Sequence, residues 1–327
     1  MTEEELLHQE MSQQENGTTA MRQFLAWRVA VHMRPFAKQI GKAAAGKSGK
    51  KMIHKLRVSC RKFRVLLKNF RDYFPQDQVG LLADEIKKLA SAFAVSREMV
   101  LLRKEIKSTR KENYTEKATM GFEVLANTCV QEDHHRKGAL QMAARSFAES
   151  DNLSLLDEYV TEHHDLDNLA AVCQNTSIQS FAQDNLTRQL RKIASEAKAL
   201  EHETPDDDFH QLRISLKNLH YSLKDFACLE EDHYDAQLGR IKQLQNLMGR
   251  IHDRQVWLAQ INEILAVIGE RNQDDEELMR NAAFAVEILK RKWRDQINAD
   301  YADLKIIWGY LQRDHFWSSF FAGDTSE

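Results

Sequence analysis

The most regular pattern of apolar and polar positions lies between residues 53 and 70. Ile53, Leu56, Cys60, Phe63 and Leu67 recur three or four residues apart. At about 100° per residue, this spacing places them along one side of an α-helix. The pattern therefore predicts an amphipathic helix with one buried side.

The polar edge of this helix is cationic. No Asp or Glu occurs between residues 47 and 71, although a solvated helix face normally mixes charges of both signs. A stripe with one sign of charge repels itself, and an anionic partner would relieve that repulsion. The stripe consists of His54, Arg57, Arg61, Arg64 and Lys68.

Helical spacing of apolar residues continues along most of the chain. Only three prolines interrupt it, and Pro35 predicts a kink or an early end of the first helix. We therefore expect an all-α protein. The predicted helices cover residues 18–40, 53–74, 77–109, 115–147, 153–159, 177–200, 209–229, 235–269 and 275–312. Residues 1–17 are expected to be a polar, disordered N-terminus, 18–150 a first helical half, 151–175 a linker with a short helix, and 176–322 a second helical half.

The second half repeats the first. Residues 209–226 align with residues 53–70, and the identical pairs include His54 with His210 and Arg57 with Arg213. Further along, residues 86–89 align with 241–244, and 97–98 with 252–253. The cationic stripe recurs as His210, Arg213, Lys217, His220 and Lys224. Packing alone does not require a repeated cationic stripe, so the repeat favours two stripes that face each other across one groove.

Composition and charge restrict the function classes. The net charge is only -3 at pH 7, so the basic stripes are local and a globally basic nucleic-acid coat protein is disfavoured. The 4 cysteines are far apart in the sequence, which is typical of small buried side chains in a reducing compartment. The acidic start of the chain argues against a signal peptide, and no apolar run approaches the roughly 20 residues of a membrane helix. We therefore expect a cytoplasmic protein without membrane contact.

The two cationic stretches resemble the CHAD family, the conserved-histidine α-helical domain. The first-half pattern of that family, His-x-x-Arg-Val-x-x-Arg-Arg-x-Arg, corresponds to His54, Arg57–Val58, Arg61–Lys62 and Arg64. The second-half pattern, His-x-x-Arg-x-x-x-Lys-x-x-Arg-Tyr, corresponds to His210, Arg213, Lys217 and His220–Tyr221. A Leu-Gly-x-x-x-Asp element is similar to residues 248–253, and the resemblance covers about residues 18–320.

The resemblance implies one CHAD domain made of two pseudo-twofold-related four-helix bundles. It also implies a basic central surface that binds inorganic polyphosphate without catalysis or cofactor. The expected polyphosphate-binding residues are His54, Arg57, Arg61, Arg64, Lys68, His210, Arg213, Lys217, His220 and Lys224. Secondary candidates are Lys62, Arg97, Arg188, Arg191 and His252; Arg188 and Arg191 form part of another basic stripe, on the helix before residue 205.

Three departures from the family pattern bear on affinity. Lys62 stands in place of an Arg and loses the forked guanidinium contact. His220 also replaces an Arg, which predicts tighter binding at pH 6 than at pH 8. Glu98 stands where Asp is usual. The first-half stripe keeps more arginines, so we expect it to carry more of the affinity.

Other motifs are interpreted as incidental. Residues 41–48 fit the G-x-x-x-x-G-K-[ST] pattern, but a P-loop requires a preceding strand and a parallel sheet. His134–His135 and the run 162–165 suggest metal ligands, yet adjacent residues on a helix point about 100° apart, so no metal site is expected. Residues 201–205 are similar to the Glu-x-Glu-x-Lys motif of triphosphate-tunnel enzymes, but the Lys is missing.

Two alternatives to polyphosphate binding stay open. One is a phosphohydrolase acting on polyphosphate or a nucleotide, although no nucleophile with a positioned base is visible. The other is a helical adaptor for RNA or an acidic protein. Nucleic acid is disfavoured because the stripes carry no aromatic stacking residues. Association with polyphosphate granules is a further expectation, and the oligomeric state is open.

Overall fold

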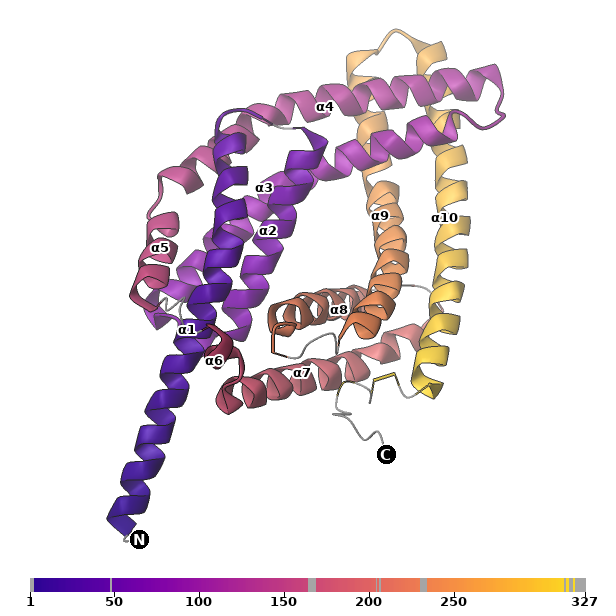
Figure 1. Cartoon of the computed structure of the whole chain (residues 1–327). Coiled ribbons are helices and arrows are strands. Elements are labelled where there is room, and N and C mark those ends of the chain that lie inside the picture. The colour runs from indigo at the N-terminus through magenta and orange to yellow at the C-terminus, as the bar shows by residue number, and fades with distance from the viewer. Residues whose placement is uncertain are drawn as a thin grey trace.

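The computed structural model describes residues 3–47, 49–163, 169–203, 205, 207–229, 234–314, 316–317 and 320. Every regular element in these ranges is a helix, which confirms the all-α prediction (Figure 1). The first half comprises α1 (Glu3–Ala44), α2 (Lys50–Asn69), α3 (Gln76–Thr109) and α4 (Glu116–Glu149). Helices α5 (Asn152–His163) and α6 (Leu169–Cys173) lead to the second half, which comprises α7 (Thr176–Glu196), α8 (Asp207–Phe226), α9 (Asp235–Arg271) and α10 (Glu276–Arg313). The 3₁₀ helices η1 (Arg71–Tyr73) and η2 (Ala197–Glu201) follow α2 and α7.

Most helix boundaries lie within a few residues of their predicted positions, and local chemistry explains several of them. The side chains of Thr115, Asn175 and Asp275 accept hydrogen bonds from the first turns of α4, α7 and α10. Two features differ from the prediction. Helix α1 begins at Glu3 and continues past Pro35 to Ala44, so Pro35 does not end it, and the linker contains α6 as an additional helix.

The two halves meet at a cluster of four phenylalanines. Phe70 of α2 and Phe226 of α8 are equivalent in the sequence repeat, and their ring centroids are 5.9 Å apart. Phe24 of α1 lies 5.8 Å from Phe70, and Phe181 of α7 lies 6.2 Å from Phe226. Phe24, Phe70 and Phe226 are fully buried and belong to one large core that includes residues of both halves. The two copies of the repeat therefore pack against each other at the C-terminal ends of α2 and α8.

Polar networks flank this aromatic cluster. On α8, the buried carboxylate of Asp225 accepts hydrogen bonds from Arg28 (2.6 Å) and contacts His32 Nε2 at 2.8 Å, both on α1. The repeat-equivalent of Asp225 is Asn69 of α2, whose amide donates to Ser222 Oγ of α8 at 2.8 Å. One copy of the repeat thus uses a buried ion pair where the other uses an uncharged hydrogen bond.

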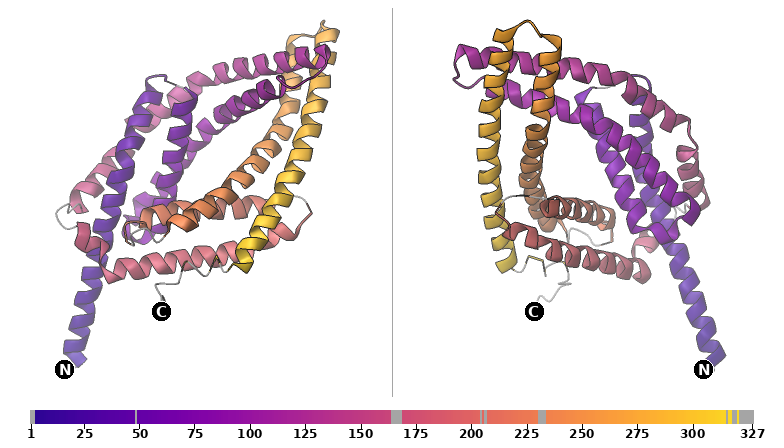
Figure 2. Two further views of the ribbon diagram at one scale, coloured as in Figure 1. Left: turned by 45° about the vertical axis from the view of Figure 1, so that its right-hand side comes forward. Right: turned by 180° about the vertical axis from the view of Figure 1, so that it is seen from behind.

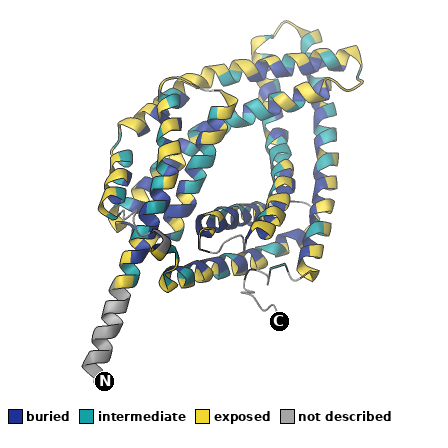
Figure 3. Cartoon of the chain, in the orientation of Figure 1, coloured by how far each residue is buried: buried dark blue, intermediate teal, exposed yellow. Residues whose placement is uncertain are grey.

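A second core joins the far ends of the long helices. The outer part of the α3–α4 hairpin packs against the outer part of the α9–α10 hairpin, as the different views show (Figure 2). Gly121 of α4 marks the closest approach, because a Cβ atom there would lie 2.1 Å from the carbonyl oxygen of Asn281 on α10. Buried positions follow the helix faces that meet in these cores (Figure 3). Each core draws on both halves, and the division into two four-helix bundles stays an expectation.

The expectations about buried cysteines and about membrane-spanning helices can both be compared with the described residues. Cys60 and Cys129 are buried as expected, but Cys173 is half-buried and Cys228 is exposed, which corrects the prediction for the second pair. Cys228 lies in the turn after α8, where its thiol donates to the carbonyl oxygen of Asp225. No helix within the described ranges is both long enough and apolar enough to cross a lipid bilayer.

Candidate functional site

Helices α2 and α8 contact each other and present their cationic stripes to the same region. Their apolar sides are fully buried, as Leu56 of α2 and Leu212 of α8 illustrate. The side chain of Asn69 on α2 hydrogen-bonds to that of Ser222 on α8. Since the apolar sides fix the rotation of both helices, the cationic edges are left to line two hollows beside them.

The first hollow has a volume of about 670 Å³ and lies beside α2, the start of α3 and the start of α8. It brings together four cations of the first stripe and three residues of the second. These are Arg57, Arg61, Arg64, Lys68, His210, Arg213 and Lys217. Arg71, Lys87 and His252 complete its basic lining, and Asp84 is the acid among its described lining residues.

The second hollow has a volume of about 550 Å³ and is lined by α2, α3, α8 and α9. Its cationic and histidine lining residues are His54, Arg57, Arg61, Lys62, Arg97, Arg213, Lys217, His220, Lys224, Lys242 and His252. Together, the two hollows include all ten of the predicted principal residues.

The hollows are related by the sequence repeat. Arg57, Arg61, Arg213, Lys217 and His252 line both of them and form the central strip of the site. Outside this central strip, four pairs of repeat-equivalent basic residues are divided between the hollows, with one member lining only the first hollow and the other only the second. These pairs are Arg64 with His220, Lys68 with Lys224, Lys87 with Lys242, and His210 with His54.

The central strip holds buried cationic groups without anionic partners. Nη1 of Arg57 and Nε of Arg213 are buried and have no hydrogen-bond partner among the described residues. Two buried cations outside the site do have anionic partners, since Arg28 pairs with Asp225 and Arg254 pairs with Asp300. An unpaired buried donor costs about 1–3 kcal/mol, and more when it is charged. An anion bound at the central strip would therefore supply the missing hydrogen-bond acceptors and lower this cost.

Burial, followed by mutual repulsion, lowers the pKa values of these cations. Burial, followed by repulsion from Arg213 and Arg61, lowers the pKa of Lys217 to about 6. The same causes, burial first and then Arg61, lower the pKa of Arg213 to about 10. Burial and Arg61 also lower the pKa of Arg57. Lys217 is therefore mostly neutral at pH 7 in the free protein, while the arginines keep their charge.

Two carboxylates lie in the second hollow, and they are equivalent in the sequence repeat. Glu98 accepts a hydrogen bond from Gln260 Nε2 at 3.0 Å. Burial raises the pKa of both Glu98 and Asp253, while the neighbouring cations, Arg57 for Glu98 and foremost Arg213 for Asp253, act in the opposite direction. These acids offset part of the local charge but leave the cations in excess.

The histidines of the site are poor cations in the free protein. Burial, followed by repulsion from Lys224, lowers the pKa of His220 to about 4. His220 is thus neutral at both pH 6 and pH 8 in the free protein, and tighter binding at pH 6, predicted from its replacement of an Arg, requires that the bound anion raise this pKa. Burial and the charge of Arg213 lower the pKa of His252 to about 3. His54 and His210 are shifted in the same direction, also mainly by burial.

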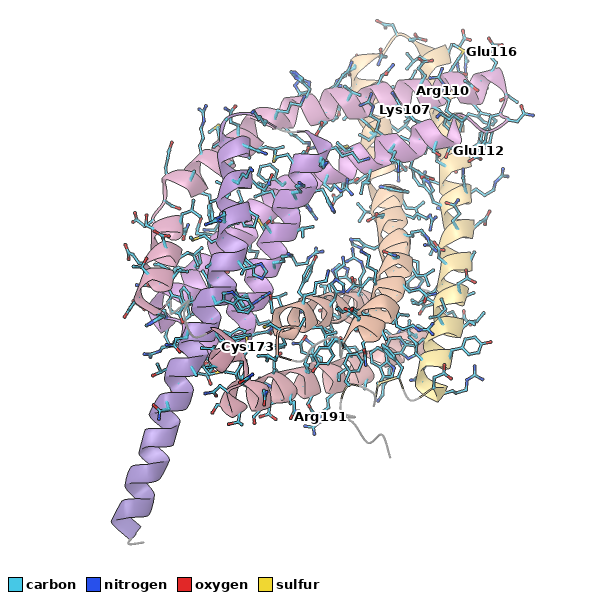
Figure 4. The ribbon with its side chains drawn as sticks, in the orientation of Figure 1. Lys107, Arg110, Glu112, Glu116, Cys173 and Arg191 are labelled. Atoms are coloured by element: carbon cyan, nitrogen blue, oxygen red, sulfur yellow. The ribbon has the colours of Figure 1, made fainter. Side chains whose placement is uncertain are left out.

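The secondary candidates separate into two groups. Lys62, Arg97 and His252 line the hollows, whereas Arg188 and Arg191 line neither. Figure 4 places Arg191 on the side of α7 that faces away from α8. Sequence reasoning missed Lys87 and Lys242 as site residues. The signal was present, because these two lysines occupy equivalent positions in the aligned segments 86–89 and 241–244.

The other motifs do not form sites among the described residues. Helix α1 precedes the loop that contains Gly46, so the strand that a P-loop needs is replaced by a helix. No group of three or more His, Cys, Asp or Glu side chains is arranged to hold a metal ion within the described ranges; His164 and Asp165 lie outside them. The second hollow does contain two aromatic side chains, Tyr221 and Trp257, which the stripes alone did not reveal.

These features define an all-helical protein with an internally repeated basic groove. The model of the CHAD domain matches residues 32–262, so the chain belongs to the CHAD domain family, a family associated with polyphosphate binding. The fold is similar to the crystal structure of the CHAD domain from the plant Ricinus communis, with a TM-score of 0.66 and 18% identity over 89% of this chain and 91% of that one. It is also similar to PptA from Streptomyces chartreusis, with a TM-score of 0.57 and 14% identity over 89% of this chain and 99% of that one. Comparison with curated proteins found no significant match.

Proposed function

We propose that this protein binds inorganic polyphosphate, without catalysis, along the groove formed by the two hollows. The observation that carries the proposal is the central strip, where repeat-equivalent cations of α2 and α8 line both hollows and buried guanidinium nitrogens lack acceptors. The association of the CHAD family with polyphosphate supports it.

The chemistry of the ligand fits the chemistry of the lining. Polyphosphate is an extended chain with about one charge per phosphate and no base edges, so recognition rests on charge and on contacts to phosphate oxygens. Arginines such as Arg57 and Arg213 offer forked contacts to two oxygens, and lysines offer a single mobile charge. Two hollows joined by a shared central strip suit a ligand that is longer than either hollow.

The acids of the second hollow do not favour hydrolysis. Glu98 is held by Gln260, and Asp253 lies among Arg213, Lys217 and Arg97. Neither is paired with a nucleophile in the described lining. A phosphohydrolase would release phosphate from polyphosphate or a nucleotide in the presence of Mg²⁺ or Mn²⁺, and we expect none.

The proposal is tested by replacing the four cations of the central strip with Ala: Arg57, Arg61, Arg213 and Lys217. We expect at least a hundredfold loss of polyphosphate affinity, because each charged hydrogen bond contributes about 1.5–3 kcal/mol. Helicity, measured by circular dichroism, should be unchanged. The matched control replaces four exposed cations outside the hollows: Lys38, Lys88, Arg188 and Arg191.

Equal affinity of the two quadruple variants would refute the proposal. A wild-type protein that prefers RNA or an acidic protein in direct competition would favour the adaptor function instead. We extend the proposal to association with polyphosphate granules, which a fluorescent fusion imaged against a polyphosphate stain would test.

A further inference from the structure

A third basic hollow lies on the outer part of α3, beyond the site described above. It has a volume of about 430 Å³ and contains no acid among its described lining residues. We call it the outer strip; its lining residues are Lys50, Val100, Arg103, Lys104, Lys107, Ser108 and Lys111. Neither the sequence repeat nor the two stripes accounts for this concentration of charge.

The outer strip continues from the second hollow along two helices. Arg97 lines the second hollow and Lys104 lines the outer strip; seven residues apart on α3, they differ by only about 20° around the helix axis. On α2, His54 of the second hollow lies one turn from Lys50 of the outer strip. The basic surface between Arg97 and Lys107 extends the groove by about 15 Å along α3.

The charges of the outer strip are free of ion pairs. Within the described residues, Lys104, Lys107 and Lys111 form no salt bridge. Two acids near this end of α3 pair with other cations, since Glu123 pairs with Arg110 and Glu112 pairs with Lys292. Glu105 of α3 is the acid next to Lys104 in the sequence, and it is not among the residues that line the outer strip. Figure 4 shows Lys107, Arg110 and Glu112 together at this end of α3.

A buried group also lacks a partner in the outer strip. Nε of Arg103 is buried and has no hydrogen-bond acceptor among the described residues. Arg103 is half-buried, whereas Lys104, Lys107 and Lys111 are exposed around it. The outer strip therefore combines a half-buried guanidinium with exposed lysines, whereas the lysine of the central strip, Lys217, is largely buried.

We propose that the outer strip is a second binding segment for the same anion, and that it holds the part of a long polyphosphate chain that emerges from the second hollow past Arg97. This inference rests on the proposed function. It adds a length preference, because a short chain fills the central hollows while only a long chain also reaches the outer strip. Affinity then rises with chain length until the chain spans both segments.

The test compares tripolyphosphate with long-chain polyphosphate on three proteins. These are the wild type, the outer-strip variant K104Q/K107Q/K111Q, and the control variant K38Q/K88Q/K117Q, which removes three equally exposed lysines elsewhere. For the outer-strip variant we expect about a tenfold loss of affinity for the long chain, as three exposed charge pairs would give. Its affinity for tripolyphosphate should change less than about twofold.

Salt dependence provides a second readout. Each lost phosphate contact reduces the slope of log affinity against log salt concentration by about 0.7, so the outer-strip variant should lose about 2 from the slope for the long chain. If the outer-strip and control variants bind the long chain equally, with equal salt slopes, the outer strip is not a binding segment. If the wild type binds neither tripolyphosphate nor the long chain, the proposed function itself is refuted.

Discussion

Binding of polyphosphate should be coupled to proton uptake by Lys217. In the free protein its pKa is lowered to about 6, by burial and by Arg213 and Arg61. Phosphate oxygens would favour the charged ammonium group and raise this pKa again. At pH 8 the free protein carries the Lys217 proton in only about 1% of molecules, so binding should take up close to one proton. At pH 5 most molecules already carry it, and the contribution of Lys217 to proton uptake should nearly vanish.

The affinity for polyphosphate should fall as the pH rises. The ligand prefers the protonated form, so affinity falls as pH rises above about 6, by up to tenfold per pH unit, or about 1.4 kcal/mol. The fall ends where pH reaches the pKa of Lys217 in the complex. The site histidines do not interfere at pH 8, because their pKa values lie below the ordinary 6.5 in the free protein.

Isothermal titration calorimetry in buffers of different ionisation enthalpy measures this proton count. The matched variant is Lys217→Arg, whose guanidinium stays charged over the whole range and should bind without proton uptake at pH 8. Two results would contradict the reasoning: no proton uptake by the wild type at pH 8, or the same uptake by Lys217→Arg.

Three further predictions concern stability. Lys217→Met should raise the free energy of unfolding of the ligand-free protein by about 1–4 kcal/mol. In the wild type, the free energy of unfolding should rise between pH 6 and 10.5, because the unfolded state binds more protons there than the folded state, in which the pKa of Lys217 is about 6. Lys217→Met should remove this rise. Melting curves at several pH values measure both effects, and the same pH profile for the variant and the wild type would show that Lys217 does not cause the rise. Gly121→Ala should destabilise the junction of α4 and α10 by about 1–3 kcal/mol in urea unfolding, whereas Gly138→Ala, with open space around its Cβ position, should not; equal effects would contradict the close approach. Asp225→Asn should cost about 3–5 kcal/mol, because it leaves Arg28 buried without its counter-charge, and a cost below about 1 kcal/mol would show that the pair is not critical.

The sequence predicted which cations lie together, but it did not predict their energetics. The cationic stripes could be predicted because helical spacing and charge are properties of a short stretch of sequence. The repeat then indicated that the two stripes face one groove. The low pKa of Lys217 could not be read, because it results from burial among Arg213 and Arg61, which come from α8 itself and from α2. His220 illustrates the same limit, since its position in the pattern does not reveal that it is buried.

Long-range packing was also beyond the sequence. The second core forms where the α3–α4 hairpin packs against the α9–α10 hairpin. In the sequence, this contact is marked by Gly121, a glycine inside α4 at the close approach to α10. Pro35 predicted a kink or an early end of the first helix. The early end is wrong, because the helix continues past Pro35 to Ala44.

The repeat relation between the two hollows has a consequence for direction. A groove whose two ends are equivalent has no inherent beginning or end, and a linear phosphate chain likewise reads the same from either terminus. Such a ligand has two equivalent ways to lie in the groove, which favours binding by a factor of about two, whereas RNA has chemically distinct 5′ and 3′ ends and gains nothing from this equivalence. Two equivalent pairs make the ends differ in charge: Arg64 with His220, and Asn218 with Lys62. That difference in charge, together with the outer strip at one end only, would make the two ends of the groove unequal, so that a long polyphosphate chain extends from the groove preferentially at one end.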